Sequence, residues 1–381
     1  MFCRVFHSLN PSLLQAMEEI KRQFQADRQM DAFDFILIAL SSRYPVWDVN
    51  ETVWQVFDTK QFAAFHATDA FNNEEIVHHG VTALFIKFER QGRIECFVQE
   101  GVSENKKEVL EKTARYLKER ENAFHIIIAG HCKAQTAFFI EKLAQYDIPI
   151  KNLLGGISSG EKVSDALLTY QFYNGEVVQD GFMILTFHHV KMATSVALGF
   201  ESVGVQYTVS KAKGYRIYRV DDNQSFAYTI ERLSRGIENF KPEYLWYTPI
   251  VVLDESSENF LTLRTFKEQT DEWVEFFGPV KEGQKIRLSY GEKENLLSAD
   301  AKSATALAAQ LPEPDLLFNF SCIARQYVLE EMQTEENRIY RNFLHAPLFG
   351  FFTFGEIGHD PSRRSLQYYN ETSLLTGMTE L

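Results

Sequence analysis

The sequence predicts an α/β protein built from two modules, with mixed parallel and antiparallel sheets flanked by helices. Three observations carry this prediction. Helical spacing alternates with apolar strands over the first 130 residues, a two-residue hairpin signal opens an antiparallel stretch near residue 174, and an aromatic strand lies near residue 350. With 381 residues and 45% hydrophobic content, the chain is long enough to bury two cores of ordinary domain size.

The first 130 residues supply the parallel part of this prediction. Asn10 and Pro11 provide a cap and a first-turn proline for a helix over about residues 11–26. "FDFILIAL" (33–40) is apolar without alternation, which is typical of a strand covered on both faces. The same order follows again, because Ser103 can cap a charged helix that runs to about residue 120, and "FHIIIAG" (124–130) forms a second buried strand. Two helix-then-strand units predict a partly parallel sheet.

The rhythm changes after residue 150. Asn174 and Gly175 lie between two β-rich runs and predict a two-residue hairpin. Helical patterns and further strands follow, with helices expected at 225–238, 299–311 and 318–345, and strands at 244–290. Hairpins give way to a helix near Val209 to Asp222, so we expect one module over residues 1–215 and a second over residues 216–381.

Charge and cysteine content exclude several functions. The net charge is -13 and no Lys/Arg cluster is present, which argues against nucleic acid or anionic lipid as a partner. The four cysteines are far apart and form no CxxC pair, so neither a disulfide framework nor a zinc site is expected. No window approaches 18 uninterrupted apolar residues. We therefore expect a cytoplasmic protein with reduced thiols and no membrane insertion.

An internal similarity places glycines and acids at matching positions. "LLGGISSGE" (153–161) and "LFGFFTFGE" (348–356) share Leu, Gly and a terminal Gly-Glu. The match is explained either by an internal duplication or by chance. With a duplication, the two strand-end Gly-Glu turns, Gly160-Glu161 and Gly355-Glu356, face one cleft between the modules, which is a usual place for a ligand. Gly155 and Gly156 in the first stretch are further candidates for binding it.

Glu356 is the first candidate for binding such a ligand. It stands between Gly355 and Gly358 at the end of an aromatic strand, where an ionised carboxylate needs a partner. Glycines there allow positive φ or a close backbone approach. Arg325 is the natural planar counter-ion. The pair either grips a polar ligand or forms a structural salt bridge.

Two further polar residues can join Glu356. Asn370 and Thr372 are two positions apart on an expected strand and so face the same side, whereas Glu371 faces the other. Thr353 and the Asn370 amide add hydrogen bonds at the same strand ends. The alternative is a set of cross-strand polar contacts with no ligand.

The histidines are candidates for a haem iron. His78-His79 and His188-His189 cannot each chelate one metal, because adjacent strand residues point to opposite faces. One axial nitrogen in an apolar pocket is enough for haem. His131 follows a buried strand at its carboxyl end and is the best placed, ahead of His188 and His78. No CxxCH occurs, so only non-covalent haem b is considered, and a hydrogen-bonded histidine is the alternative at each position.

Enzyme motifs are absent from the sequence. "GGISSGEK" (155–162) has neither the GxSxG spacing nor the P-loop spacing, and no HExxH, EF-hand or GxGxxG occurs. We therefore expect no enzyme. A hydrolase or transferase is the alternative, and its marker is a Ser or Thr hydroxyl within hydrogen-bond reach of a His in a central cleft.

The C-terminal third resembles a known family. "FNFSCIARQYVLEEM" (318–332), "LFGFFTFGEIGHD" (348–360) and "YYNETSLLTGM" (368–378) are similar to the C-terminal module of FIST proteins, which are bacterial sensory proteins. "FDFILIALSSRYP" (33–45) and "LLGGISSGE" are similar to the N-terminal FIST module. Two departures stand out. "FHATDAFNNEEI" (65–76) lacks the glycines usual in that stretch, and Leu198 replaces a histidine that often occurs there.

The resemblance implies binding rather than catalysis. FIST proteins are associated with sensing small ligands, amino acids among them, beside histidine kinases, chemoreceptors and cyclic-di-GMP enzymes. One branch resembles haem proteins that sense nitric oxide. The expectation is a sensor that binds a small molecule and signals through a separate partner, such as a histidine kinase or a cyclic-di-GMP enzyme. The alternative within the same class is a haem-based nitric oxide sensor.

Overall fold

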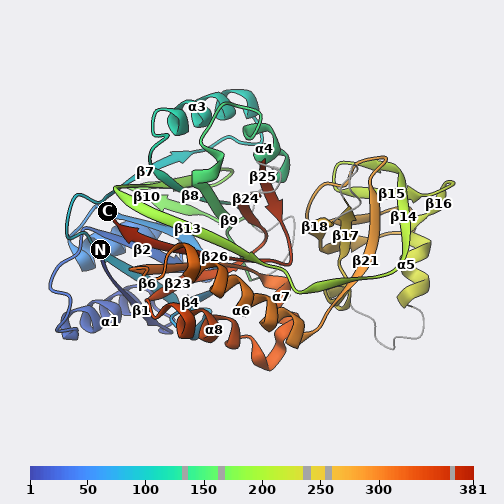
Figure 1. The fold of residues 1–381 in the computed structure, drawn as a ribbon. Coiled ribbons are helices and arrows are strands. Elements are labelled where there is room, and N and C mark those ends of the chain that lie inside the picture. The colour runs from blue at the N-terminus through green and yellow to red at the C-terminus, as the bar shows by residue number, and fades with distance from the viewer. Residues whose placement is uncertain (131–135, 162–167, 235–241, 254–259, 361–364) are drawn as a thin grey trace.

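The protein consists of a large three-sheet body and a smaller β domain beside it (Figure 1). The computed structural model describes residues 1–130, 136–161, 168–234, 242–253, 260–360 and 365–381. Mixed sheets flanked by helices confirm the predicted fold class. The chain enters the small domain after residue 197 and leaves it after residue 291, so the small domain is an insertion in the body.

The body repeats one unit three times. The first unit contains β1 (Phe2–Ser8), α1 (Leu13–Ala26), β2 (Phe35–Leu40), α2 (Val49–Phe57), β3 (Phe62–His66), β4 (Asp69–Asn72), β5 (Glu75–His78) and β6 (Val81–Lys87). The second contains β7 (Arg93–Gln99), α3 (Lys106–Lys118), β8 (Phe124–Ala129), α4 (Thr136–Leu143), β9 (Leu153–Ile157), β10 (Gln171–Tyr173), β11 (Glu176–Val178) and β12 (Phe182–His188).

The third unit surrounds the small domain. It contains β13 (Val190–Ala197), α6 (Lys293–Gln310), β22 (Leu316–Cys322), α7 (Ile323–Leu329), α8 (Glu335–Leu344), β23 (Leu348–Thr353), β24 (Glu356–Asp360), β25 (Ser365–Tyr369) and β26 (Ser373–Glu380). The sequence similarity between 153–161 and 348–356 falls on β9 and β23, which occupy equivalent places in the second and third units. The strand orders of the three sheets show that the first unit has the same arrangement of strands as the second and third.

Each unit gives its hairpin to the sheet of another unit. The strand orders are β1-β6-β2-β3-β10-β11, β7-β12-β8-β9-β24-β25 and β13-β26-β22-β23-β4-β5. In all three sheets the two central strands are parallel and every other pair is antiparallel. This cyclic exchange ties the three units together, so strands from both ends of the sequence share sheets.

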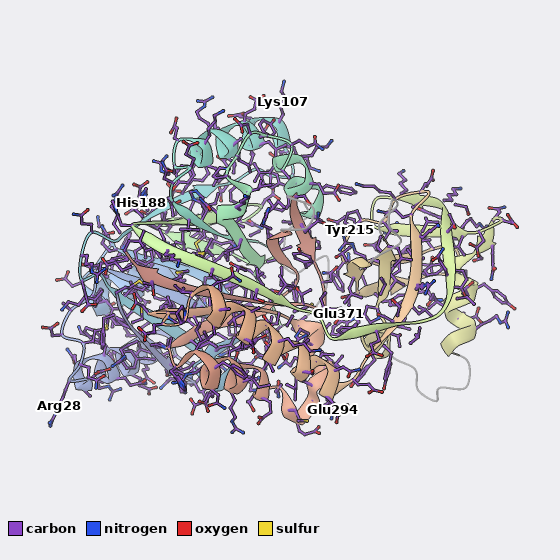
Figure 2. The ribbon with its side chains drawn as sticks, viewed as in Figure 1. Arg28, Lys107, His188, Tyr215, Glu294 and Glu371 are labelled. Atoms are coloured by element: carbon purple, nitrogen blue, oxygen red, sulfur yellow. The ribbon has the colours of Figure 1, made fainter. Side chains whose placement is uncertain are left out.

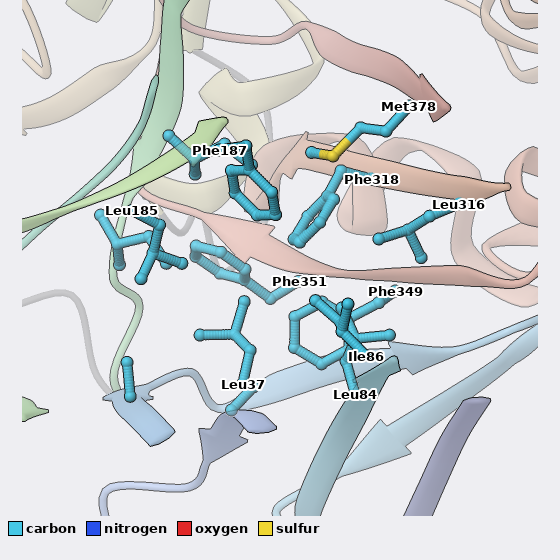
Figure 3. Packing of buried hydrophobic residues seen from close by; sticks show 14 of the residues in the cluster. Leu37, Leu84, Ile86, Leu185, Phe187, Leu316, Phe318, Phe349, Phe351 and Met378 are labelled. Carbon is cyan, nitrogen blue, oxygen red and sulfur yellow. The ribbon is translucent and has the colours of Figure 1, made fainter. Parts of the chain in front are cut away.

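The three sheets pack around one shared core, and the helices cover their outer faces. Alternate residues of the inner strands point inward, among them Leu37 of β2, Leu185 of β12, Phe318 of β22 and Phe351 of β23 (Figure 3). The opposite faces pack on α1 and α2, on α3 and α4, and on α6 and α8. A strand buried on both faces has no polar alternation, which explains the continuous apolar runs in the sequence.

The small domain, as far as the structure describes it, is an antiparallel sheet with one α-helix. Its elements are β14 (Phe200–Lys213), β15 (Arg216–Val220), β16 (Gln224–Ser225), α5 (Phe226–Ser234), β17 (Ile250–Leu253), β18 (Phe260–Arg264), β19 (Phe266–Gln269), β20 (Val274–Phe276) and β21 (Lys285–Gly291). The short helices at Val46–Asp48, Ile150–Asn152, Pro242–Tyr247 and Glu330–Met332 are 3-10 turns. The small domain has a core of its own, built around Ile217, Phe226 and Phe276.

Of the predictions for single elements, one is confirmed and another is wrong in part. The hairpin at Asn174 and Gly175 is confirmed, and both residues have positive φ (49° and 88°), as the tight turn requires. The helix expected over 318–345 is wrong at its start, because Leu316–Cys322 is a central strand of the third sheet and α7 begins only at Ile323. The boundary between modules 1–215 and 216–381 stays a prediction.

Glu380, at the end of β26, contacts the N-terminus of the chain and the backbone between β6 and β7. Its carboxylate accepts hydrogen bonds from the amides of Glu89, Arg90 and Gly92 at 2.8, 2.9 and 2.9 Å, and it lies 2.9 Å from the Met1 ammonium. Burial alone raises the pKa of Glu380, but these donors outweigh it and hold the pKa at about 2.

A Glu380→Gln variant is expected to lose about 2–3 kcal/mol of unfolding free energy at pH 7. Because the folded-state pKa is depressed, this contribution is present above about pH 4.5 and disappears as the pH falls towards 2. Urea unfolding at pH 7 and pH 3 checks it. The more exposed Glu89, substituted in the same way, serves as the control. Equal losses in the two variants would contradict the prediction.

Candidate functional site

Polar residues gather where the parallel central strands of all three sheets end. Thr68 follows β3, and its amide donates to Ser159 Oγ, which follows β9, at 3.3 Å. The hydroxyl of Ser41, after β2, lies 3.3 Å from a carboxylate oxygen of Glu161. The amide of Phe354, after β23, donates to the Ile157 carbonyl at 3.1 Å. The carboxyl ends of parallel strands are a usual place for ligands in α/β sheets.

The small domain covers the third-unit side of these strand ends. The Tyr215 hydroxyl accepts from the Ala137 amide at 3.1 Å, and Trp246 packs on Cys322 and Ala324. Figure 2 shows Tyr215 and Glu371 at the junction between the body and the small domain. Candidate ligand groups therefore lie between two parts of the structure that only two chain crossings connect.

Glu356 begins β24 and is fully buried. The hydroxyl of Thr353 bonds one of its carboxylate oxygens, and the Thr372 hydroxyl and amide bond the other at 2.6 and 3.3 Å. Burial raises the pKa of Glu356 to about 8, although these hydrogen bonds oppose the rise. At neutral pH the group is mainly a neutral carboxylic acid, with both oxygens held by its own chain.

The expected ion pair between Glu356 and Arg325 is wrong. Arg325 is buried in the first turn of α7, and its guanidinium bonds Asp300 at 2.7 and 2.8 Å and Glu336 at 2.9 Å. Its remaining bond goes to the Leu198 carbonyl at 3.1 Å. The two acids come from α6 and α8, so Arg325 joins the three helices of the third unit and makes no hydrogen bond to Glu356.

Asn370 and Glu371 lie in the tight turn between β25 and β26 rather than on a strand. Glu371 has a φ of 60°, so the expected strand alternation does not hold. Its Oε1 accepts from the Thr265 hydroxyl of the small domain at 2.8 Å. Its Oε2 and the Asn370 Oδ1 are buried and have no hydrogen-bond partner within the part of the chain that the structure describes. Burial, with the nearby Glu356, raises the pKa of Glu371 to about 8. A cavity of about 10 Å³ beside Asn370 is about large enough for one water.

Packing accounts for the three candidate glycines. A Cβ on Gly155, which has a φ of 154°, would lie 1.8 Å from the Ile127 carbonyl oxygen. One on Gly156 would lie 2.6 Å from the Thr353 methyl group, and one on Gly355, with a φ of 147°, would lie 2.3 Å from the Tyr368 hydroxyl. Each position requires the absence of a side chain, and the ligand-binding role of these glycines stays a prediction.

A larger cavity of about 290 Å³ opens between the small domain and the body. It is lined by Glu141, Ala144 and Gln145 near the end of α4, by Leu366, Gln367 and Tyr368 of β25, and by Val252, Thr262, Arg264, Pro279, Lys281 and Gln284 of the small domain. Its volume is close to the lower end of the range for small-molecule sites, roughly 300–1,000 Å³. It is the cavity that best matches the expected cleft between two modules.

The two described candidate histidines, His188 and His78, do not lie in a haem pocket. The His188 Nε2 lies 3.1 Å from Glu95, with Arg93 and Arg120 near, and Figure 2 shows it far from the small domain. His78 is about half exposed, 3.2 Å from Asp69. His131 lies outside the described residues. His188 and His78 both lie beside charged side chains, so neither residue offers haem an apolar pocket. Among the described parts of the chain, no three His, Cys, Asp or Glu side chains gather to hold a metal ion.

A hydroxyl–imidazole contact, the marker of the enzyme alternative, occurs in the wrong place. Thr186 Oγ1 lies 3.0 Å from His125 Nδ1. Both residues are fully buried, and Tyr116 of α3 covers them, so no substrate reaches the pair. Burial lowers the pKa of His125 to about 4, which keeps the imidazole neutral. This pair has a structural role beneath α3.

Sequence reasoning missed Arg264 and the role of Tyr368. Arg264 ends β18, and its side chain reaches the carbonyl of Tyr368 in the body at 3.1 Å. A signal was present, because "FLTLRTF" (260–266) places an arginine inside an otherwise apolar strand run. A charged residue at such a position is rarely buried without a reason.

The fold and the cavity define a two-part mixed α/β protein, with a ligand-sized space where the parts meet. Comparison with known proteins agrees. The FIST N domain model matches residues 34–223 and the FIST C domain model matches residues 226–359. An uncharacterized protein from Aquifex aeolicus (strain VF5) is 37% identical over 262 residues, which cover 67% of this chain and 96% of that protein. The chain belongs to the FIST family, whose domains are associated with sensory signal transduction. No helix in the described ranges is both long and apolar enough to cross a membrane.

Proposed function

We propose that this FIST protein is a non-catalytic sensor in which a small ligand binds between the small domain and the body. The cavity of about 290 Å³ lined by residues of both parts carries the proposal. A ligand that touches both parts binds one of their relative arrangements better than another, and only that difference in affinity drives a signal. The signal then passes to a separate partner, and a histidine kinase is the partner class we propose.

The connection between the two parts supports a hinge. The chain crosses at Gly199 and at Gly291, and the neighbouring residue Phe200 pairs directly with Gly291 in the sheet. Gly199 has a φ of 84°. The two crossings therefore lie side by side, at glycine-containing ends of β14 and β21. Domain closure in other proteins uses a few such positions at the ends of elements.

Polar contacts across the junction fix the position of the small domain on the body in this structure. Thr265 of the small domain bonds Glu371 of the body, and Arg264 bonds the Tyr368 carbonyl. Glu356 and Thr353 lie beneath this layer with Asn370, and a ligand reaches them only if these contacts part. Their direct contact with a ligand is therefore a finer proposal than binding in the cavity itself.

A ligand screen with two matched variants tests the proposal. Amino acids and related small metabolites are screened by thermal shift, and hits are measured by calorimetry. Gln145→Trp fills the mouth of the cavity, whereas Lys142→Trp adds the same bulk on an exposed part of α4 that does not line it. We expect a hit whose affinity falls at least tenfold in Gln145→Trp and stays within twofold in Lys142→Trp.

The sensor mechanism also needs a change of arrangement. Spin labels at Lys107 of α3 and Asn223 of the small domain report the distance between the two parts. Addition of the ligand should shift the distribution of this distance. A hit that Gln145→Trp leaves unchanged contradicts the proposed site. A ligand that binds in the cavity but leaves the distance distribution the same contradicts the signalling mechanism.

A further inference from the structure

We propose that Arg264 anchors an anionic group of the ligand, a carboxylate or a phosphate, in the cavity between the small domain and the body. The inference rests on the proposed function, because it concerns the same cavity, and it adds the chemical class of the ligand. It comes from the guanidinium of Arg264 in the described lining of the cavity, which is buried and has no acid within 4.0 Å among the described residues, the carboxylate of Glu141 lying farther off.

Arg264 is a buried cation whose described partners are all neutral. Only 5% of the residue is exposed. Its Nε donates to the Pro279 carbonyl at 3.0 Å, and its Nη1 donates to Thr262 Oγ1, the Leu263 carbonyl and the Tyr368 carbonyl at 3.0, 2.9 and 3.1 Å. Among the described residues, no carboxylate lies within 4.0 Å of the guanidinium, and its Nη2 has no hydrogen bond. A buried charge without a counter-ion is costly, which points to an anion from outside the chain.

The surroundings of Arg264 hold the guanidinium in a fixed position. A Cβ on Gly278 would lie 2.7 Å from Arg264 Nε and 2.8 Å from its Cδ, so only glycine leaves space for the side chain there. The Tyr368 ring centroid is 5.8 Å from the guanidinium carbon. With four hydrogen bonds on Nε and Nη1, the side chain has little freedom to lose when an anion binds. Preorganisation of this kind favours binding.

The rest of the lining narrows the ligand class. Lys281 and Glu141 lie 3.4 Å apart and balance each other's charge at the cavity. Three amide side chains, those of Gln145, Gln284 and Gln367, add neutral donors and acceptors. The described lining, with Arg264, Lys281 and Glu141, therefore has a net positive charge of one, which suits a small ligand with one anionic group and a neutral polar remainder. A planar guanidinium suits the paired oxygens of carboxylate and phosphate.

Anion binding is tested on the whole protein with simple probes. Sodium succinate and inorganic phosphate are titrated separately by calorimetry at constant ionic strength, with sodium chloride as the reference salt. We expect saturable binding of at least one probe, and the tighter of the two identifies the carboxylate or the phosphate source. Arg264→Lys keeps the charge but loses the planar fork, and we expect at least a tenfold weaker affinity. Lys142→Gln removes an exposed cation of α4 that does not line the cavity, and it should change the affinity no more than twofold.

The outcomes separate this proposal from the proposed function. No saturable binding of either probe, or equal affinity in wild type and Arg264→Lys, overturns the role of Arg264. If a screened metabolite still binds in a manner sensitive to Gln145→Trp, the cavity remains the ligand site although Arg264 is not its anchor. If succinate or phosphate binds through Arg264 but the spin-label distance stays the same, the anion site stands and the sensor mechanism fails. Should Arg264→Lys not fold, the Gln145→Trp variant must abolish probe binding, and retention there overturns the proposal.

Discussion

Replacing Arg325 with alanine is expected to lower the free energy of unfolding by about 3–5 kcal/mol. The guanidinium is fully buried and bonds two fully or almost fully buried acids, Asp300 and Glu336. Burial raises the pKa of Asp300 to about 7, even with Arg325 beside it to stabilise the charge. Removing the cation leaves both acids in a low dielectric with no counter-charge, and this costs more than the lost packing. Urea unfolding at pH 7 measures the change.

Two further variants identify the cause of this loss. Arg341→Ala removes a half-buried cation paired with Glu74 at 2.9 Å, and it should cost no more than about 1 kcal/mol. The triple variant Arg325→Met, Asp300→Asn and Glu336→Gln removes all three charges together. It should recover a large part of the loss, because a buried ion cluster replaced as a whole is often nearly neutral in stability. A triple variant less stable than Arg325→Ala would contradict this electrostatic explanation.

The separate parts of the fold were more predictable than their assembly. Apolar runs at 33–40 and 124–130 gave buried strands because burial on both faces removes alternation, and Asn174-Gly175 gave a hairpin because both residues tolerate positive φ. The region from 318 was misread as helix because "FNFSC" alternates over only a few residues before a true helix starts. The exchange of hairpins among three sheets depends on contacts between residues roughly 100 to 280 positions apart, and no local pattern encodes it.

The candidate site, too, was predicted only in part, because the contacts of its side chains depend on the tertiary structure. A carboxylate between glycines was correctly singled out as unusual, since Glu356 is buried and its pKa is raised. Thr353 and Thr372 were expected beside it, and both bond its carboxyl. The expected counter-ion Arg325 instead bonds acids of two helices that no local pattern places nearby. Arg264 was missed because its importance comes from burial at a junction between two parts of the structure. Burial of a single polar side chain is a tertiary property.

The stability of the wild-type protein is expected to fall as the pH rises from about 4.5 to about 8, and Glu356→Gln should remove much of this fall. The folded-state pKa of Glu356 is about 8, against an ordinary value of 4.5. The folded protein therefore holds this proton more tightly than the unfolded chain does. The stabilisation is complete below about pH 4.5 and is lost through pH 8. At about 1.4 kcal/mol per pKa unit, the rise corresponds to roughly 5 kcal/mol as an upper figure.

Glutamine keeps the shape of Glu356 and retains hydrogen bonds to Thr353 and Thr372, but it carries no charge at any pH. Urea unfolding at pH 5, 7 and 8.5 should therefore give nearly the wild-type value at pH 5 and a gain of roughly 2–5 kcal/mol at pH 8.5. Glu371→Gln should act in the same direction, because burial raises the pKa of that carboxyl as well. Exposed Glu121 provides the control, and its substitution by glutamine should leave the pH dependence as it is. If the pH dependence of Glu356→Gln equals that of the wild type, water reaches the carboxyl, and Glu356 is then open to a ligand without any parting of the small domain from the body.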